Sequence, residues 1–326
     1  MPKDTIPFRE TNYFSDLICD YLDEKEELRQ FYNRYPKIEN FLDQINQKQS
    51  VFESINREVL VNSLNEQYKD IEVSPITSKN IKSLSKETTF TITTGHQLNL
   101  FTGPLYFFYK IISAINLCKD LKHSYPDFDF VPVYWMATED HDFEEINFFN
   151  YQNQKVTWSK NAAGAVGELD LNGLENVYKT FEKKLGVSKN AQELRLLFKT
   201  AYLDHNTLTE AMRYLVNELF SEYGLVILDG NDKRLKSLFI PYIKDEILNK
   251  TSFKSVSKTN EKIKSLNKDY SIQVNPREIN LFYLKDGVRE RIVEKDNRFI
   301  ALNSDFLPLI ACSQVIIDHS VIHFLV

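Results

Sequence analysis

The chain has 326 residues, which is enough for about two domains or for one large domain with insertions. Hydrophobic residues make up 42% and charged residues of both signs 26%, so a disordered chain, a collagen and a coiled-coil rod all fit poorly. The formal net charge of −6 leaves no overall basic footprint for nucleic acid, and no apolar run approaches the roughly 18 residues of a membrane helix. We therefore expect neither nucleic acid nor a membrane as a partner.

The cysteines and glycines indicate the cellular compartment and exclude some kinds of binding site. The three cysteines are odd in number and far apart, and none has C-x-x-C spacing, which suits a cytoplasmic protein without a thiolate metal site. The first residues lack the apolar stretch of a signal peptide. Neither G-x-G-x-x-G nor G-x-x-x-x-G-K-[ST] occurs among the 9 glycines, so the two standard glycine-rich phosphate loops are excluded.

Residues 1–86 are expected to form a helical segment that packs on the core. Apolar side chains recur near the helical period in the stretches 14–32, 38–49 and 57–71, and strand signals are few.

Residues 87–150 are expected to form the first half of an α/β core. The run F-T-I-T-T at 90–94 is a short β-type stretch that ends at Gly95. The run F-V-P-V-Y-W-M at 130–136 is typical of a strand buried on both faces of a parallel sheet, and Pro132 favours an early or edge position in that sheet.

A long helix is predicted between these two strands. Gly103 and Pro104 open a helical stretch that runs to about residue 122, with Thr102 as a candidate cap. The stretch is apolar on nearly all sides, so we expect it to be largely buried. Strand, helix and strand together have the length of a βαβ unit.

The rest of the chain resumes the core after an interruption. Residues 151–206 are expected to be an insertion, with a strand at 155–158 and amphipathic helices at 174–185 and 191–202. The second half of the core, residues 207–303, is expected to contain a helix at 208–223, a buried strand at 224–229, a helix at 232–249, and hairpin-like strands at 271–274, 279–284 and 288–293 with Asp286 and Gly287 in a turn. Both halves are assigned to one parallel sheet, and residues 304–326 form an atypical apolar tail.

A polar turn, T-T-G-H-Q-L-N-L-F-T-G-P, joins the first strand to the long helix. Open parallel sheets bind ligands outside the carboxyl ends of their strands, and a helix start there offers N–H groups to an anion. Two of the nine glycines fall in this turn, where the backbone must come close to something. The candidate binding residues are Thr94, Gly95, Gln97, Thr102 and Gly103, with His96 as a catalytic candidate. The alternative is a polar loop with ordinary helix capping.

A second candidate site follows the strand at 130–136 directly. Glu139, Asp140, His141 and Asp142 place three carboxylates and an imidazole in four residues. If they converge, such a cluster needs a cation, an amine or a shared proton, and it suits a metal, an ammonium group or acid–base transfer. The alternative is a solvated acidic turn that caps the next helix. If the strands at 90–94 and 130–136 are parallel neighbours, the turns that follow them would face the same crevice.

Three weaker signals lie further along the chain. Asp229 ends a buried strand and either lines the same crevice or belongs to a turn before a helix cap at Asp232. In N-P-R-E, Asn275 and Arg277 are candidates for binding a carboxylate or phosphate, although a surface arginine is the commoner case. Residues 255–259 loosely match the mobile lysine signature of class I aminoacyl-tRNA synthetases.

Three long motifs together resemble the cysteine ligases of bacillithiol biosynthesis. They are T-T-G-H-Q-L-N-L-F-T-G-P-L-Y from Thr93, Y-W-M-A-T-E-D-H-D-F-E-E-I-N from Tyr134, and N-P-R-E-I-N-L-F-Y from Asn275. The resemblance implies a Rossmann-like parallel sheet with helices on both faces, a helical N-terminal segment and an insertion like a connecting peptide. It also implies that cysteine is joined to glucosaminyl-malate in the last step of bacillithiol synthesis, with ATP as a possible activating cofactor and no bound metal.

Under this resemblance, the turn around Gly95 and Gly103 would hold phosphate or malate oxygens. Glu139, Asp140 or Asp142 would hold a substrate amine, and His96 or His141 would take the proton from the attacking amine. The H-x-G-H motif of the synthetases is absent, and Gly95-His96-Gln97 only occupies the comparable place. Two alternatives remain open, a metal-dependent hydrolase using the cluster at 139–142 and a nucleotide- or sugar-binding protein without turnover.

The family resemblance also bears on chain length. It stops at about residue 303, and the family's chains are considerably longer, with a C-terminal coiled coil that mediates dimerisation. That part is not found here, so the sequence predicts a truncated or frame-disrupted family member, which can carry the site residues and still be inactive.

Overall fold

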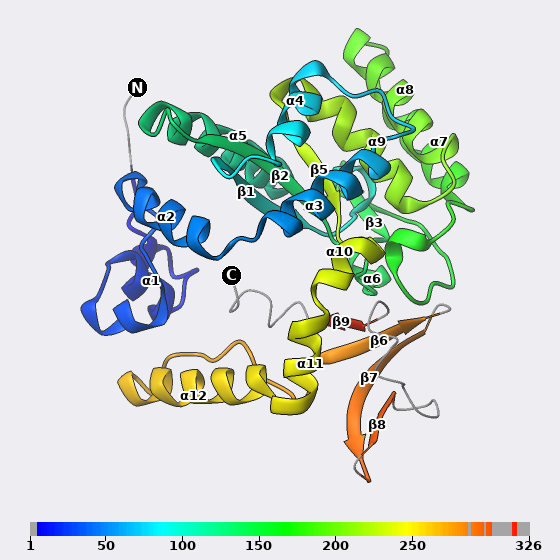
Figure 1. Cartoon of the computed structure of the whole chain (residues 1–326). Helices are drawn as coiled ribbons and strands as arrows, with labels where there is room; N and C mark the ends of the chain where they lie inside the picture. The colour runs from blue at the N-terminus through cyan, green and yellow to red at the C-terminus, as the bar shows by residue number, and fades with distance from the viewer. Residues whose placement is uncertain (1–4, 286–287, 297, 302–314, 318–326) are drawn as a thin grey trace.

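The computed structural model describes residues 5–285, 288–296, 298–301 and 315–317 (Figure 1). Its centre is a parallel three-stranded sheet in the order β1-β2-β5, formed by β1 (Thr89–His96), β2 (Asp129–Met136) and β5 (Val226–Asp229). The crossover from β1 to β2 contains the predicted long helix, α5 (Tyr106–Ser124). The predicted α/β class with a Rossmann-like parallel sheet is therefore confirmed.

The middle strand β2 is covered on both faces. Its neighbouring side chains Val133 and Tyr134 point to opposite faces of the sheet, and they are 5% and 0% exposed. Pro132 pairs with β1, whereas pairing with β5 begins only at Val133, so the missing N–H of the proline interrupts no bond to β5. Pro132 is nevertheless the fourth of the eight residues of β2, the middle strand of the sheet, so the prediction of an early or edge position is wrong.

Side chains from neighbouring helices satisfy the outer edge of β5. The N–H groups of Ile227 and Asp229 donate to Tyr68 Oη (2.7 Å) and Gln67 Oε1 (2.9 Å), near the end of α3 (Ser54–Gln67). Arg213 Nη1, on α9 (Leu208–Phe220), donates to Ile227 O (2.9 Å). Burial raises the pKa of Tyr68 to about 12, which keeps its hydroxyl protonated. These three backbone groups of β5 are therefore satisfied without another strand beside β5.

The long helix α5 differs from its prediction in one respect. Phe107, Ile111 and Leu121 are buried against β1 and β2, but Leu105, Tyr106, Tyr109 and Ile112 are exposed. The helix is apolar on nearly all sides, but only one side has a sheet to pack on. The prediction that this helix is largely buried was therefore wrong.

The N-terminal part is helical, as predicted, but it is broken into shorter pieces. The stretch 14–32 forms α1 (Asp16–Leu22) and a separate 3-10 helix (Glu26–Phe31) instead of one helix. Next come α2 (Phe41–Val51), α3 and α4 (Pro75–Ser83). The sequence analysis missed α4, which has Ser74 as its cap and a proline at its first position.

The segment between β2 and α9 contains the predicted helices and a small hairpin. Its elements are α6 (Phe143–Ile146), β3 (Phe148–Tyr151), β4 (Gln154–Thr157), α7 (Leu174–Lys184) and α8 (Lys189–Leu203). β3 and β4 pair antiparallel, and Figure 1 shows α7 and α8 side by side at one end of the molecule.

After β5 the chain forms a second, smaller core. The predicted helix 232–249 is two helices, α10 (Lys233–Leu238) and α11 (Ile240–Asn249), with Pro241 in the first turn of α11. Next come α12 (Thr251–Leu266) and an antiparallel sheet in the order β8-β7-β6-β9, formed by β6 (Leu281–Lys285), β7 (Val288–Lys295), β8 (Arg298–Ala301) and β9 (Val315–Ile317).

Several predictions for this part can be compared with the structure. The hairpin of β6 and β7 is confirmed, but residues 271–274 form no strand. The turn at 286–287 lies outside the described residues. So does the tail at 304–326, except for β9, which pairs with β6. Within the described ranges, no helix has both the length and the apolar character needed to cross a membrane.

One buried carboxylate ties the N-terminal helices to the end of α12. Asp20 on α1 accepts from Arg9 Nη2 (2.7 Å) and from the hydroxyl of Tyr270, and Lys25 Nζ lies 3.0 Å away. Burial alone would raise the pKa of Asp20, but the bonds from Tyr270, Lys25 and Arg9 outweigh it and lower the pKa to about 2.

Because this pKa lies below the unfolded value of about 3.9, the Asp20 contacts stabilise the fold above that pH. Their contribution is lost as the pH falls from about 4 to about 2. We expect Asp20→Asn to lower the free energy of unfolding at pH 7 and to have a smaller effect at pH 3, measured by urea unfolding. Asp43→Asn, at an exposed position on α2, is the control. Equal effects of Asp20→Asn at both pH values would contradict this assignment.

Candidate functional site

The loop between β1 and α5 has an unusual backbone. Phe101, Thr102 and Gly103 are consecutive residues with positive φ, at 51°, 70° and 61°. A Cβ on Gly103 would lie 2.4 Å from Asn99 Cβ, so this glycine is required by a close approach. At Gly95 a Cβ would meet atoms only at 3.8 Å, so no described protein atom requires glycine there. The predicted close approach is therefore confirmed at Gly103 alone.

Thr102 does not cap the helix that follows. The N-cap of α5 is Leu105, which supplies no side-chain cap, and Thr102 is buried in a 3-10 turn (Leu100–Thr102) before it. The capping prediction is wrong because the left-handed turn delays the start of the helix by several residues.

The side chain of Phe101 anchors this loop in an aromatic cluster. Its ring centroid lies 4.5 to 4.9 Å from those of Phe149, Phe181, Phe198 and Tyr202. The Phe101 N–H donates to Tyr202 Oη (2.9 Å). The partners come from β3, α7 and α8, so the predicted insertion holds the β1–α5 loop in position.

His96 lies against the start of α5. Its ring packs on Tyr106 and Phe107, with centroids 5.1 and 5.4 Å away, and its Nδ1 lies 2.9 Å from Gln97 O. The side chain is buried, and burial lowers its pKa, with a smaller contribution in the same direction from Lys110. The imidazole is therefore neutral near pH 7. Within the described ranges its Nε2 has no hydrogen-bond partner.

Gln97 joins the two predicted turns. Its Nε2 donates to Asp140 Oδ2 (2.9 Å), after β2, and to Glu145 Oε2 (2.8 Å), on α6. Thr94 lies on β1 opposite Tyr134, two residues before His96. The carboxyl ends of β1 and β2 therefore meet through direct contacts, as expected of neighbouring parallel strands.

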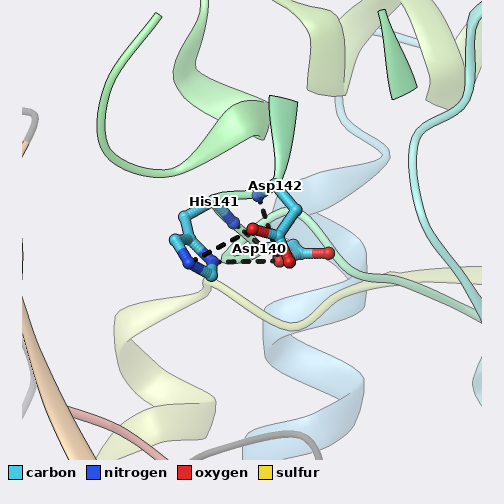
Figure 2. Close-up of side chains that lie close together, drawn as sticks. All are labelled: Asp140, His141 and Asp142. Atoms are coloured by element: carbon cyan, nitrogen blue, oxygen red, sulfur yellow. Dashed lines mark hydrogen bonds and ion pairs between the residues drawn. The ribbon is translucent and has the colours of Figure 1, made fainter. Parts of the chain in front are cut away.

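Asp140, His141 and Asp142 converge at this place, as Figure 2 shows. Asp140 Oδ1 accepts from the backbone N–H of His141 (2.7 Å) and lies 3.4 Å from His141 Nδ1. On the other side of the ring, Asp142 Oδ1 lies 3.3 Å from Nε2. Asp140 is buried, whereas Asp142 is exposed, so the ring lies between the interior and the solvent.

Arg289 reaches the same imidazole from β7. Its Nη1 lies 3.1 Å from His141 Nε2, although the two residues are 148 positions apart. A guanidinium can only donate, so Nε2 accepts, and the ring proton belongs on Nδ1, facing Asp140. Sequence reasoning missed Arg289 because nothing local to the hairpin indicates which loop it faces.

A second hydrogen-bond network joins the ends of β2 and β5. Asp229 Oδ1 accepts from the Thr138 hydroxyl and from Asn231 N–H (2.8 Å). Lys236 on α10 donates to Asn231 Oδ1. Burial lowers the pKa of Lys236, and the nearby carboxylates of Glu139, Asp229 and Glu168 act against that shift. The prediction that Asp229 belongs to this edge of the sheet fits its contacts.

Lys236 is a further half-buried cation, and its sequence context did not predict this position. It follows Lys233 and Arg234 in a charged stretch that suggests a solvated helix face. Glu139, whose carboxylate acts on it, is itself only 4% exposed. The segment at 165–168 closes over this place, and a Cβ on Gly167 would lie 2.6 Å from Thr138 Cβ.

The remaining candidates lie outside the cluster of Asp140, His141 and Asp142. Asp232 caps α10 by accepting from Arg234 N–H (2.8 Å). Residues 255–259 lie within α12, which Figure 1 shows apart from the sheet. Asn275 is exposed in the loop before β6, and Arg277 in the same loop lies with its Cζ 5.4 Å from the centroid of Phe282.

The cluster has donor atoms that could hold a metal ion. One ligand atom from each of Asp140, His141 and Asp142 lies within 4.8 Å of the others. However, the Arg289 guanidinium already places a positive charge beside His141 Nε2. This charge disfavours a divalent cation, and likewise a protonated amine, at that atom, so Nε2 suits the role of a proton acceptor.

Comparisons with known proteins agree with this fold. Residues 1–307 match the family model described as "Bacillithiol biosynthesis BshC, N-terminal Rossmann-like domain". Relatives named "Putative cysteine ligase BshC" include that of Flavobacterium psychrophilum, 53% identical over 94% of this chain and 57% of its own length. The relative from Flavobacterium johnsoniae is 53% identical over 93% of this chain and 57% of its own length, and one from Bacillus cereus is 26% identical over 87% and 54%. The chain thus spans a little over half the length of these relatives. It belongs to the BshC family and carries the family's N-terminal Rossmann-like domain.

Proposed function

We propose that this chain carries the reaction centre of a ligase that joins cysteine to glucosaminyl-malate in the last step of bacillithiol synthesis. The convergence of Gln97, Asp140, His141 and Asp142 at the carboxyl ends of β1 and β2 is the observation that carries the proposal. Parallel sheets bind substrates at this edge. The relatives' name, "Putative cysteine ligase BshC", and the family's description as a bacillithiol biosynthesis family support the proposal. We also propose that the enzyme works in the cytoplasm, as its cysteine pattern suggests.

His141 suits the role of general base. Its proton lies on Nδ1 toward Asp140, so Nε2 has the lone pair that can accept a proton from an attacking amine. Asp140 would then stabilise the imidazolium that forms. The orientation of Asp140 is fixed by Gln97 and by the backbone N–H of His141.

The acidic residues suit an amine substrate. Before attack the amine is an ammonium group, and Asp142 at the exposed rim and Glu139 in the interior provide carboxylates to hold it. His96 is an alternative base, but its ring is enclosed by Tyr106 and Phe107.

Amide formation from a free carboxylate needs activation, for which we propose ATP. Bound ATP would supply an adenylyl or phosphoryl group to the cysteine carboxylate, with release of pyrophosphate or ADP, and so turn the carboxylate oxygen into part of a leaving group. The loop at Gly103 and the start of α5 fit its anionic part, because no side chain caps this helix. Near this start, Asn99 Oδ1 is a buried polar atom without a partner among the described residues, and it would accept a hydrogen bond from the nucleotide.

The test is direct. Purified chain is supplied with cysteine, glucosaminyl-malate and ATP, and the products are followed by mass spectrometry. We expect bacillithiol together with AMP or ADP, none of which should form when cysteine is omitted. Binding of substrates without product, with any energy donor, would contradict catalysis by this chain. A stoichiometric divalent metal in the purified chain, together with a hydrolase activity that a chelator abolishes, would favour the metal-dependent hydrolase instead.

A further inference from the structure

Two arginine side chains share one phenyl ring beside the candidate site. The Cζ atoms of Arg289 and Arg277 lie 3.5 and 5.4 Å from the centroid of Phe282, so these two carbons are within about 9 Å of each other. Phe282, on β6, is itself buried. A cation over an aromatic face is attracted by the negative π-surface, so the ring helps to hold both groups.

Both arginines are carried by fixed backbone. Arg289 lies on β7, which pairs with β6, and its Nη1 contacts His141 Nε2. Arg277 is in a loop, but its N–H donates to Asn280 Oδ1 (2.9 Å) and its carbonyl accepts from Asn280 Nδ2 (2.8 Å). Asn280 is buried and also donates to Glu246 Oε1 (3.0 Å) on α11. The loop carrying Arg277 is therefore tied to the second core.

Acidic and basic groups surround the imidazole. Asp140 Oδ1 faces Nδ1 of His141, whereas Asp142 Oδ1 and Arg289 Nη1 both lie beside Nε2. An anion with two acidic groups could offer one of them to each guanidinium. Guanidinium groups match carboxylates and phosphates in a bidentate geometry that other side chains do not offer.

We propose that Arg277 and Arg289, held on Phe282, form a subsite for the dianionic malyl end of the substrate, next to His141. This proposal rests on the proposed ligase function, because that function supplies the dicarboxylate. The shared ligand chemistry is a compact dianion, which a nucleotide phosphate also provides. Arg289 would donate to the dianion at the expense of its bond to His141, leaving Nε2 to face the reacting amine.

The experiment measures binding and needs no turnover. Malate and inorganic phosphate are titrated separately into the whole chain by calorimetry. We expect malate to bind, and Arg289→Gln and Arg277→Gln each to weaken it at least about 10-fold, the usual loss for a charged hydrogen bond. Arg289→Lys keeps the charge but loses the planar guanidinium that can donate two parallel hydrogen bonds. The affinity of this variant for malate should therefore be intermediate. Arg298→Gln, at an exposed position on β8, should bind malate as the unchanged chain does.

Three other binding results would overturn the proposal, and a fourth result separates it from the ligase function. Malate affinity unchanged in both glutamine variants, with circular dichroism showing a native fold, would remove the arginines from the site. Binding of phosphate alone would assign the subsite to a nucleotide and not to malate, and binding of neither ligand would remove the subsite. A chain that makes no bacillithiol but loses malate binding on Arg289→Gln would contradict only the ligase function.

Discussion

Asp140→Asn and His141→Ala are each expected to lower the rate of bacillithiol formation at least about 10²-fold, the size of a lost general base. Asparagine is isosteric with aspartate, but it cannot accept from Gln97 Nε2 and stabilise a charged imidazole at the same time. In His141→Ala the proton acceptor itself is gone. Rates are to be measured under saturating cysteine, glucosaminyl-malate and ATP.

The two substitutions should leave the fold in place. Asp140 contacts groups of its own loop and Gln97, and His141 is only half-buried, so neither fills the main core. Thermal unfolding midpoints within a few degrees of the unchanged chain are the expected control result. Asp120→Asn, at an exposed position on α5, should retain full activity. Near-normal rates in both site variants would remove these residues from the chemistry.

The central sheet could be predicted because its strands leave strong local signals. The runs at 130–136 and 224–229 are apolar without alternation, as strands buried on both faces require. Once the strands are parallel, their carboxyl ends share one edge of the sheet. The meeting of Gln97 with Asp140 then follows from topology and not from any spacing in the sequence.

Features that depend on tertiary contacts left no such signal. Arg289 reaches His141 from a hairpin 148 residues away, and Lys236 sits in a charged run typical of a solvated helix. The exposed side of α5 is apolar in sequence and simply has no partner among the described elements. These three features depend on which parts of the chain pack against each other. The pattern of apolar residues within one segment does not say which other segment it will contact.

Phe101 is the clearest case of a residue whose role only the structure reveals. In sequence it is one more apolar residue in a polar turn, but in the fold it joins that turn to β3, α7 and α8. We expect Phe101→Ala to lower the free energy of unfolding by about 3–5 kcal/mol, because it leaves a cavity among four aromatic rings. Urea unfolding measures the loss, and Phe52→Ala, at a 44% exposed position, should cost much less.

A comparison with glycine separates packing from backbone strain at this position. Phe101 has φ 51° and ψ 42°, a left-handed conformation that costs a residue with a Cβ about 1–2 kcal/mol. Elsewhere glycine is usually less stable than alanine by about 0.5–1 kcal/mol, because its unfolded chain is more flexible. Here relief of the left-handed strain offsets that loss, so Phe101→Gly should be no less stable than Phe101→Ala. If glycine is clearly the worse of the two, the loop is not held in this conformation. Some other contact would then have to hold Gln97 in place beside Asp140.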